Sequence, residues 1–190
     1  MLSNRGRSRY REFQVIAIYD NPSIGTWNAS YVWSRARGDL NSIDYFLGDF
    51  PAFVVRRNEY GPQPFDSPHR FLAYGQLRIR HEINISPLVE IRSGFPFSFV
   101  NERLDFIGPR NQAGRFPTFL SLAVQATKGF GIPSVVPKLG GRRARIGVAV
   151  INATSHFNPR DVQNNIASPQ VGQFFNSLGT SVRAKFELDF

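Results

Sequence analysis

The last eleven residues of the chain, Thr180 to Phe190, alternate between apolar and polar side chains without interruption. Because 42% of the chain is hydrophobic, ten such positions in a row arise by chance about once in a thousand tries for each phase. Strict alternation places the apolar side chains on one face of a β-strand and the charged ones on the other. A membrane-spanning strand needs about 9–11 residues of this kind, apolar outside and polar inside. The segment therefore favours a transmembrane β-strand.

The same alternation recurs along the chain, and we predict seven strands in total. They are Tyr10–Tyr19, Thr26–Arg35, His69–Arg80, Ile83–Phe95, Phe119–Thr127, Arg143–Ala153 and Thr180–Phe190. Ile16 and Ile18 blur the pattern in the first strand. Pro87 lies inside the fourth, and because proline has no N–H, we predict a bulge or a lost hydrogen bond there.

The connections between these strands run short, long, short, long, intermediate, long, and the intermediate one lies between the fifth and sixth strands. The short ones lie at Asp20–Ser23 and near His81, and the long ones are Gly38–Pro68, Pro96–Pro117 and Thr154–Gly179. Outer-membrane barrels have short periplasmic turns and long extracellular loops. The fold we predict is thus all-β, an antiparallel up-and-down transmembrane β-barrel segment. Single-chain bacterial barrels have an even number of strands, so we expect seven strands of a larger barrel.

Composition narrows the alternatives. No window approaches 18 consecutive apolar residues, which excludes a transmembrane helix but not a barrel of alternating strands. Residues 1–9 are polar and basic and lack the apolar stretch of a secretory signal peptide. Since an outer-membrane protein needs such a signal, we expect residues 1–190 to be the C-terminal fragment of a longer barrel protein, without its plug domain.

Several loop motifs resemble those of Oar-like TonB-dependent outer-membrane transporters. They are Asn28–Ser34, Asn58–Gly61, Pro68–Phe71, Ile91–Pro96, Asp105–Asn111, Arg115–Thr118, His156–Asn165, Gly172–Ser177 and Lys185–Phe190. The resemblance covers nearly the whole chain. It implies an outer-membrane location and a barrel of about 22 strands. It also implies a plug, which this chain lacks, and a missing N-terminal part that couples to the TonB system.

The resemblance also assigns partners. The ending Phe186, Leu188 and Phe190 resembles the C-terminal signal that the barrel-assembly machinery reads. The further expected partners are outer-membrane lipid and the missing rest of the barrel and plug. No nucleic acid partner is expected.

Two sets of residues are candidates for solute contact. In the long loop after the second strand, aromatic and arginine residues of the kind favoured at binding surfaces are Tyr45, Phe53, Arg56, Arg57 and Tyr60. The charges expected to face the lumen are Arg78, Arg92, Arg183, Lys185 and Glu187. Packing between loops and ion pairing across strands are the alternative roles of these two sets.

No catalytic constellation is recognisable. Cysteine is absent, and His69, His81 and His156 are too far apart in sequence to suggest a metal site. No Gly-x-Ser-x-Gly elbow or phosphate-binding loop occurs. We therefore expect no enzyme activity, no cofactor and no metal.

The net charge of +9 leaves a rival hypothesis open, a soluble basic β-rich module that binds nucleic acid or other polyanions. Against it, the charges alternate along strands instead of lining one groove together with aromatic residues. A second rival is a self-contained eight-stranded barrel, against which the missing eighth strand and signal peptide argue.

Overall fold

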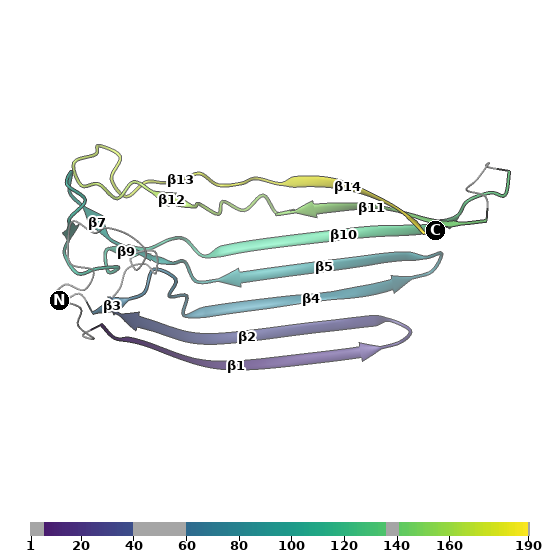
Figure 1. Cartoon of the computed structure of the whole chain (residues 1–190), viewed down its shortest axis with the longest axis horizontal. Helices are drawn as coiled ribbons and strands as arrows, with labels where there is room; N and C mark the ends of the chain where they lie inside the picture. Colours follow the sequence, from purple (N-terminus) through teal and green to yellow (C-terminus); the bar gives the residue numbers. More distant parts are fainter. Residues whose placement is uncertain (1–5, 40–59, 136–140, 190) are drawn as a thin grey trace.

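The computed structural model describes residues 6–39, 60–135 and 141–189, all of whose regular structure is β. Seven long strands form one antiparallel sheet in the order β1-β2-β4-β5-β10-β11-β14, which is sequence order (Figure 1). These strands are β1 (Ser8–Asn21), β2 (Gly25–Gly38), β4 (His69–Ile79), β5 (Ile83–Arg92), β10 (Phe119–Gly131), β11 (Arg143–Ile151) and β14 (Ser181–Asp189). The all-β antiparallel prediction is confirmed. The sheet is open, because β1 and β14 are not paired with each other.

Short strands occupy the long connections. They are β3 (Gly61–Pro62), β6 (Pro96–Phe97), β7 (Phe99–Val100), β8 (Phe106–Ile107), β9 (Gly114–Arg115), β12 (Asp161–Val162) and β13 (Phe174–Phe175). β3 pairs with β2, and the others pair as β6–β9, β7–β8 and β12–β13. The sequence predicted only loops here, because strands of two residues are too short to show alternation. All of them gather at one end of the sheet, which we call the loop end; the hairpins lie at the other, the turn end (Figure 1).

The seven predicted strands all exist, with boundaries that either coincide with the prediction or shift by at most four residues. The largest extensions are in β2, which continues to Gly38, and in β10, which continues to Gly131. Arg37 and Gly38 remain paired with Arg9 and Ser8, so the ladder extends beyond the clean alternation. β5 is shorter than predicted and ends at Arg92.

The strands pair in constant register, so apolar residues of one strand mostly meet apolar residues of the next. One row runs from Tyr19 on β1 through Trp27 and Gly75 to Pro87, and continues through Val124, Val150 and Val182 on β14. A slip of one residue in any strand would bring its charged side chains onto this face. The register is therefore fixed by the sequence pattern in all seven strands.

Pro87 has one of the two effects expected of it. The β4–β5 ladder omits the two positions at which Pro87 and Ser86 would face Gly75 and Gln76. The pairs on either side, Tyr74 with Leu88 and Leu77 with Ile85, share one register, so no residue is inserted. The proline thus interrupts pairing without a bulge, because it lacks the N–H that the ladder needs.

The turn end depends on tight hairpins. In the β1–β2 hairpin, Asn21 Oδ1 accepts hydrogen bonds from Ser23 N at 2.9 Å and Ile24 N at 3.2 Å. Gly25 follows with φ of +137°, and a Cβ there would lie 1.7 Å from Gln76 O. Only glycine fits this position, both for its backbone conformation and for the close approach of β4.

The described part of the chain has almost no hydrophobic core. The only buried apolar residues in it are Ala36, Val100 and Ala144, and no large side chain in it is fully enclosed. The accessible surface is 13575 Å² for 21.5 kDa. A compact monomer of that mass exposes about 9,200 Å². A single-layer sheet buries neither of its faces, so this fold needs another body or another solvent against it.

Gly75 provides a test of the register. A Cβ on Gly75 would lie 2.6 Å from Trp27 Cε3 and 2.7 Å from Thr26 O, whereas a Cβ on Gly131 would meet nothing within 4 Å. Gly75→Ala is expected to lower the free energy of unfolding by about 1–3 kcal/mol, because the neighbouring strand must move. The matched Gly131→Ala variant should be neutral or slightly stabilising. Denaturant titration in detergent micelles measures both, and equal stabilities would contradict this register.

Candidate functional site

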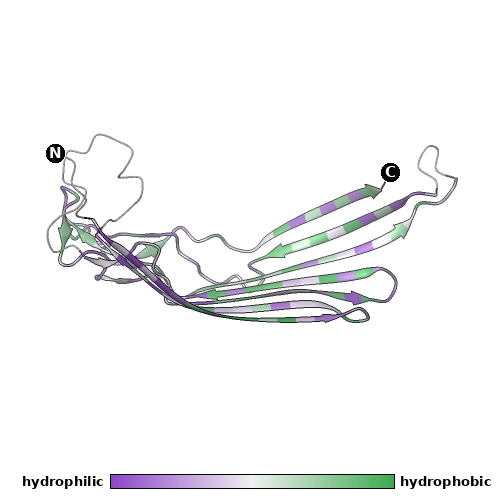
Figure 2. Ribbon diagram, turned by 60° about the horizontal axis from the view of Figure 1, so that its bottom comes forward, coloured by the Kyte–Doolittle hydropathy of each residue, from purple (hydrophilic) through white to green (hydrophobic). Residues whose placement is uncertain are grey.

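The structure offers two candidate sites, a whole face of the sheet and a cleft at the loop end. The first is the larger, and we call it the apolar face. Most of its positions between the Phe13–Trp33 pair and Leu188 hold apolar residues, and the exceptions are Asn21, Gly25, His69, Gly75 and Lys128. Examples are Val15, Ala17, Ala29, Tyr31, Phe71, Ala73, Val89, Ile91, Leu120, Leu122, Ala126, Ile146, Val148 and Ala184. Many are strongly exposed, among them Phe13 at 61%, Val182 at 66% and Phe186 at 64%. Figure 2 shows the resulting alternation of hydrophobic and hydrophilic residues along the strands.

Aromatic residues mark both ends of this face on the first two strands. Phe13 faces Trp33 near the loop end, and Tyr19 faces Trp27 near the turn end. Six residues separate Phe13 from Tyr19, which corresponds to about 20 Å along the strand. The small residues Ala17 and Ala29 face each other between the two aromatic pairs. This distribution is typical of the aromatic girdles that border an apolar band of about 25 Å.

The opposite face, which we call the polar face, carries the charges predicted to face a lumen. Arg145 Nη1 donates to Glu187 Oε2 at 3.1 Å across β11 and β14, and Lys185 also pairs with Glu187. Glu90 Oε1 lies 3.4 Å from Arg70 Nε and 3.6 Å from Arg92 Nε. Arg145–Glu187 and Arg70–Glu90 bridge neighbouring strands, as the ion-pairing alternative predicts, whereas Arg92–Glu90 and Lys185–Glu187 pair residues of the same strand. Each exposed pair contributes at most about 1 kcal/mol, so their value is mainly to neutralise charge.

The polar face is less polar than the sequence pattern suggested. A row across it contains Ile18, Tyr74 and Leu88, which are 71%, 47% and 39% exposed. Ile16, with 58% exposure, lies next to this row on β1. The two isoleucines that blur the alternation of the first strand therefore belong to an apolar strip inside the charged face.

The loops at the loop end form a hydrogen-bonded assembly around Asp66. Asp66 is only 3% exposed; its Oδ1 accepts from Ala36 N at 2.6 Å and its other carboxylate oxygen binds Arg115. Arg115 Nη1 also donates to Asp66 O at 2.7 Å and to Gly94 O at 3.1 Å. One ion pair thus joins the end of β2 to the connection before β4 and to the connection after β5.

A second buried arginine extends the assembly. Arg110 is 2% exposed and its guanidinium donates to the carbonyl oxygens of Gly38 and Asp39, the latter at 2.6 Å. Beside it, Asn111 Nδ2 donates to Pro62 O at 2.8 Å and Asn111 N donates to Ser98 Oγ at 2.7 Å. Because buried guanidinium and amide groups need partners, these residues fix the loop against β2 and β3.

Asparagines hold the last long connection against the sheet. Asn158 pairs with the backbone of Leu120 in both directions, as acceptor at 3.0 Å and donor at 2.8 Å. Asn152 Nδ2 donates to His156 O at 3.0 Å and to Leu178 O at 3.1 Å. The rings of Phe97, Phe116 and Phe174 pack beside these contacts with centroids 5.2–6.0 Å apart.

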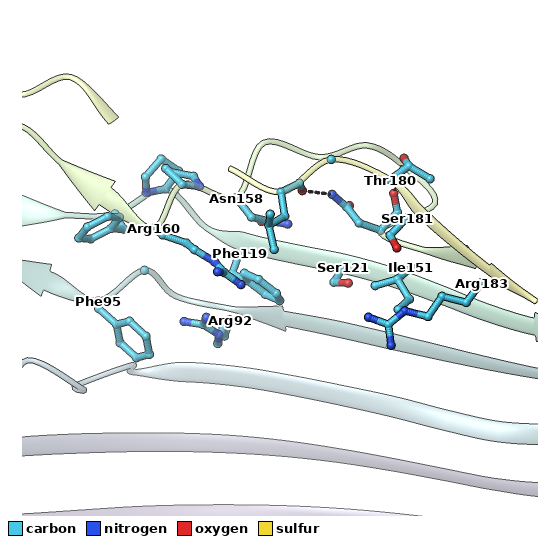
Figure 3. Close-up of a pocket in the computed structure, with 17 residues that line it drawn as sticks. Arg92, Phe95, Phe119, Ser121, Ile151, Asn158, Arg160, Thr180, Ser181 and Arg183 are labelled. Carbon is cyan, nitrogen blue, oxygen red and sulfur yellow. Dashed lines mark hydrogen bonds between the residues drawn. The ribbon is translucent and has the colours of Figure 1, made fainter. Parts of the chain in front are cut away.

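Between this assembly and the polar face lies a cleft of about 720 Å³, which Figure 3 shows. Arg92 lies between Phe95 and Phe119, with its guanidinium carbon 4.4 and 4.3 Å from the two ring centroids. Arg160 and Arg183 also line the cleft, and none of its lining residues is acidic. Its size suits a small organic molecule, and its charge favours an anion. The sequence had grouped Arg92 and Arg183, but only the fold adds Arg160.

The predicted site residues have mixed outcomes. Phe186 and Leu188 lie on the apolar face, opposite Ile146 and Ala144. Phe190 and the loop residues Tyr45, Phe53, Arg56 and Arg57 lie outside the described residues. The Tyr60 ring lies 4.8 Å from the guanidinium carbon of Arg7 and 5.7 Å from that of Arg37. Arg78 Nη1 donates to Pro22 O at 3.2 Å. Their roles in assembly or solute contact stay predictions.

Sequence reasoning missed the residues that build the loop assembly, chiefly Asp66, Arg110, Arg115, Asn152 and Asn158. Three of them, Arg110, Arg115 and Asn158, lie within the loop motifs quoted above, which was the signal available. Among the described residues, no group of three or more His, Cys, Asp or Glu could hold a metal ion. No helix in the same ranges is long and apolar enough to cross a membrane.

No family model, curated protein or solved structure matches this chain. The fold and the chemistry of its two faces are therefore the basis for assigning a function.

The loop assembly yields a second prediction. Asp66→Ala removes a carboxylate that binds Arg115 and the backbone of β2, which is expected to cost about 1–3 kcal/mol of local stability. Tryptic cleavage after Arg115 should then accelerate by roughly five- to a hundredfold, measured against cleavage after the exposed Arg103. Gln170→Ala, at an exposed position of the same end of the molecule, is the control and should leave the rate unchanged. An unchanged rate in Asp66→Ala would contradict the central role of this ion pair.

Proposed function

We propose that this chain is the C-terminal β-barrel portion of an Oar-like, TonB-dependent outer-membrane transporter, in which it forms part of the pore wall. The observation that carries the proposal is the apolar face, continuous and exposed over seven strands in one register. Exposing that much apolar surface to water is unfavourable, at about 25 cal/mol per Å². Lipid hydrocarbon would cover it at no such cost, while the polar face would line the interior.

The connections support one orientation in the membrane. The long connections assemble at one end of the sheet and two of the hairpins at the other are tight. Outer-membrane barrels place long loops outside the cell and short turns in the periplasm. We therefore assign the loop end to the extracellular side. In that orientation the arginine-lined cleft opens near the mouth of the pore, on the side of the polar face.

The open edges indicate which partners the sheet needs. β1 and β14 each leave one row of backbone groups unpaired, and such groups cost several kcal/mol each inside a bilayer. Further strands of the same barrel would pair both edges. The apolar strip on the polar face, around Ile18 and Leu88, would be covered by the plug domain that the resemblance implies. The missing N-terminal part that the resemblance implies would couple the transporter to the TonB system. The barrel-assembly machinery would recognise Phe186, Leu188 and Phe190.

Neighbouring residues in β2 test which face meets lipid. Ala29 lies in the middle of the apolar face, and Ser30 lies next to it on the polar face. Ala29→Arg should lower the stability of the inserted chain by about 2–4 kcal/mol, because it places a charge in hydrocarbon. Ser30→Arg, the matched control, should change stability little. Urea titration of the chain folded into lipid vesicles measures both variants, and equal tolerance at the two positions would reject the proposed orientation of the sheet.

The location of the native gene product separates this proposal from its rival. Detergent-free fractionation should recover it with outer membranes, and recovery in the cytosol would reject the transporter assignment. The soluble alternative draws on the net charge of +9 and predicts nucleic acid binding whose affinity falls steeply with salt. The exposed apolar face argues against it, because a soluble single-layer sheet with two free edges is prone to aggregate.

A further inference from the structure

Four arginines continue the apolar face beyond its aromatic border at the loop end. β1 and β2 pair Arg9 with Arg37 and Arg11 with Arg35, directly after the pair of Phe13 and Trp33. Since residues two apart share a face, these guanidinium groups project on the side of the aromatic pair. We call Arg9, Arg11, Arg35 and Arg37 the arginine patch. At the turn end, the cation within the apolar face is the single Lys128.

The patch combines like charges in direct register. Like-charged residues opposite each other in a ladder destabilise a sheet. Among the described residues no carboxylate forms an ion pair with Arg9, Arg11 or Arg35, all three of which are exposed. Arg37 differs because its guanidinium lies over the Tyr60 ring. Within the described residues, the arginine patch is therefore a cluster of positive charge, at one level of one face, that lacks a carboxylate partner at Arg9, Arg11 and Arg35.

We infer that the arginine patch binds the phosphate groups of anionic lipid in the leaflet at the loop end. Guanidinium groups bind phosphate oxygens in a bidentate manner, and two facing arginines can share one phosphate. The position supports a lipid source, because the patch directly follows Phe13 and Trp33, where the hydrocarbon would end and the head groups begin. The inference rests on the proposed function, since it requires the apolar face to lie in a bilayer.

The two tryptophans of the chain allow a local measurement. Trp33 lies beside the patch and Trp27 lies near the turn end. In a Trp27→Phe background, Trp33 alone reports on the lipids around the patch by energy transfer to a dansyl-labelled lipid A, a bisphosphorylated glycolipid. In a Trp33→Phe background, Trp27 reports on the opposite end. The full chain is folded into phosphatidylcholine vesicles and titrated with the labelled lipid.

We expect Trp33 to show labelled lipid A enriched around it and Trp27 to show none. Replacing Arg9, Arg11 and Arg35 together by Gln should weaken the enrichment by roughly fivefold per arginine, on the order of a hundredfold in all. Lys128→Gln, a cation removed from the same face at the other end, should leave it unchanged. Raised salt should weaken the interaction of the parent chain.

The outcomes distinguish this inference from the proposed function. If tryptophan emission stays at its water-exposed wavelength in vesicles, the chain has not inserted and the proposed function itself fails. If emission shifts to the blue but lipid A is not enriched, or the triple variant equals the parent, the inference alone is wrong. If inorganic phosphate fully displaces the labelled lipid A, the patch is a site for free anions. If acidic residues of a neighbouring strand pair with the patch, enrichment of lipid A will be lost in the complete barrel. Both results overturn the assignment to lipid.

Discussion

The structure depends on alternation kept in register across seven strands. Each strand alone would form a two-faced ribbon, but pairing without bulges joins seven apolar faces into one surface. Even Pro87, which interrupts the β4–β5 ladder, leaves the register unchanged. Because the sheet is a single layer, nothing in the described chain covers that surface. The environment of the apolar face is therefore the central question for function.

The two ends of the sheet follow different physical rules. At the turn end, local backbone geometry is sufficient, as at Gly25, where a side chain would collide with β4. At the loop end, long connections would expose many backbone groups, and buried polar side chains satisfy them instead. Asp66, Arg110 and Asn158 each bond to backbone from a distant segment. Of these three residues, Asn158 also lines the cleft over the polar face.

Charge is distributed unevenly on both faces. On the polar face, several basic residues have carboxylate partners. The positive charges of Arg92, Arg160 and Arg183 come together at the cleft. On the apolar face, positive charge accumulates at the loop end in the arginine patch. A net charge of +9 read from composition alone suggested a generic attraction to polyanions. In the structure, positive charge instead gathers at two separate places, the cleft on the polar face and the arginine patch on the apolar face.

The sequence by itself determined the strands, their order along the chain and the division of each into an apolar and a polar side. This was possible because alternation with a period of two residues can be recognised in one strand without knowing which strand pairs with it. It could not determine that Ile18, Tyr74 and Leu88 align across strands, since that needs the register. It could not assign Asp66 to Arg115, which are 49 residues apart, or bring Arg160 beside Arg92. Such contacts arise only when the long connections fold onto one another. Alternation along one strand does not indicate which distant residues will form a hydrogen bond or line the same cleft.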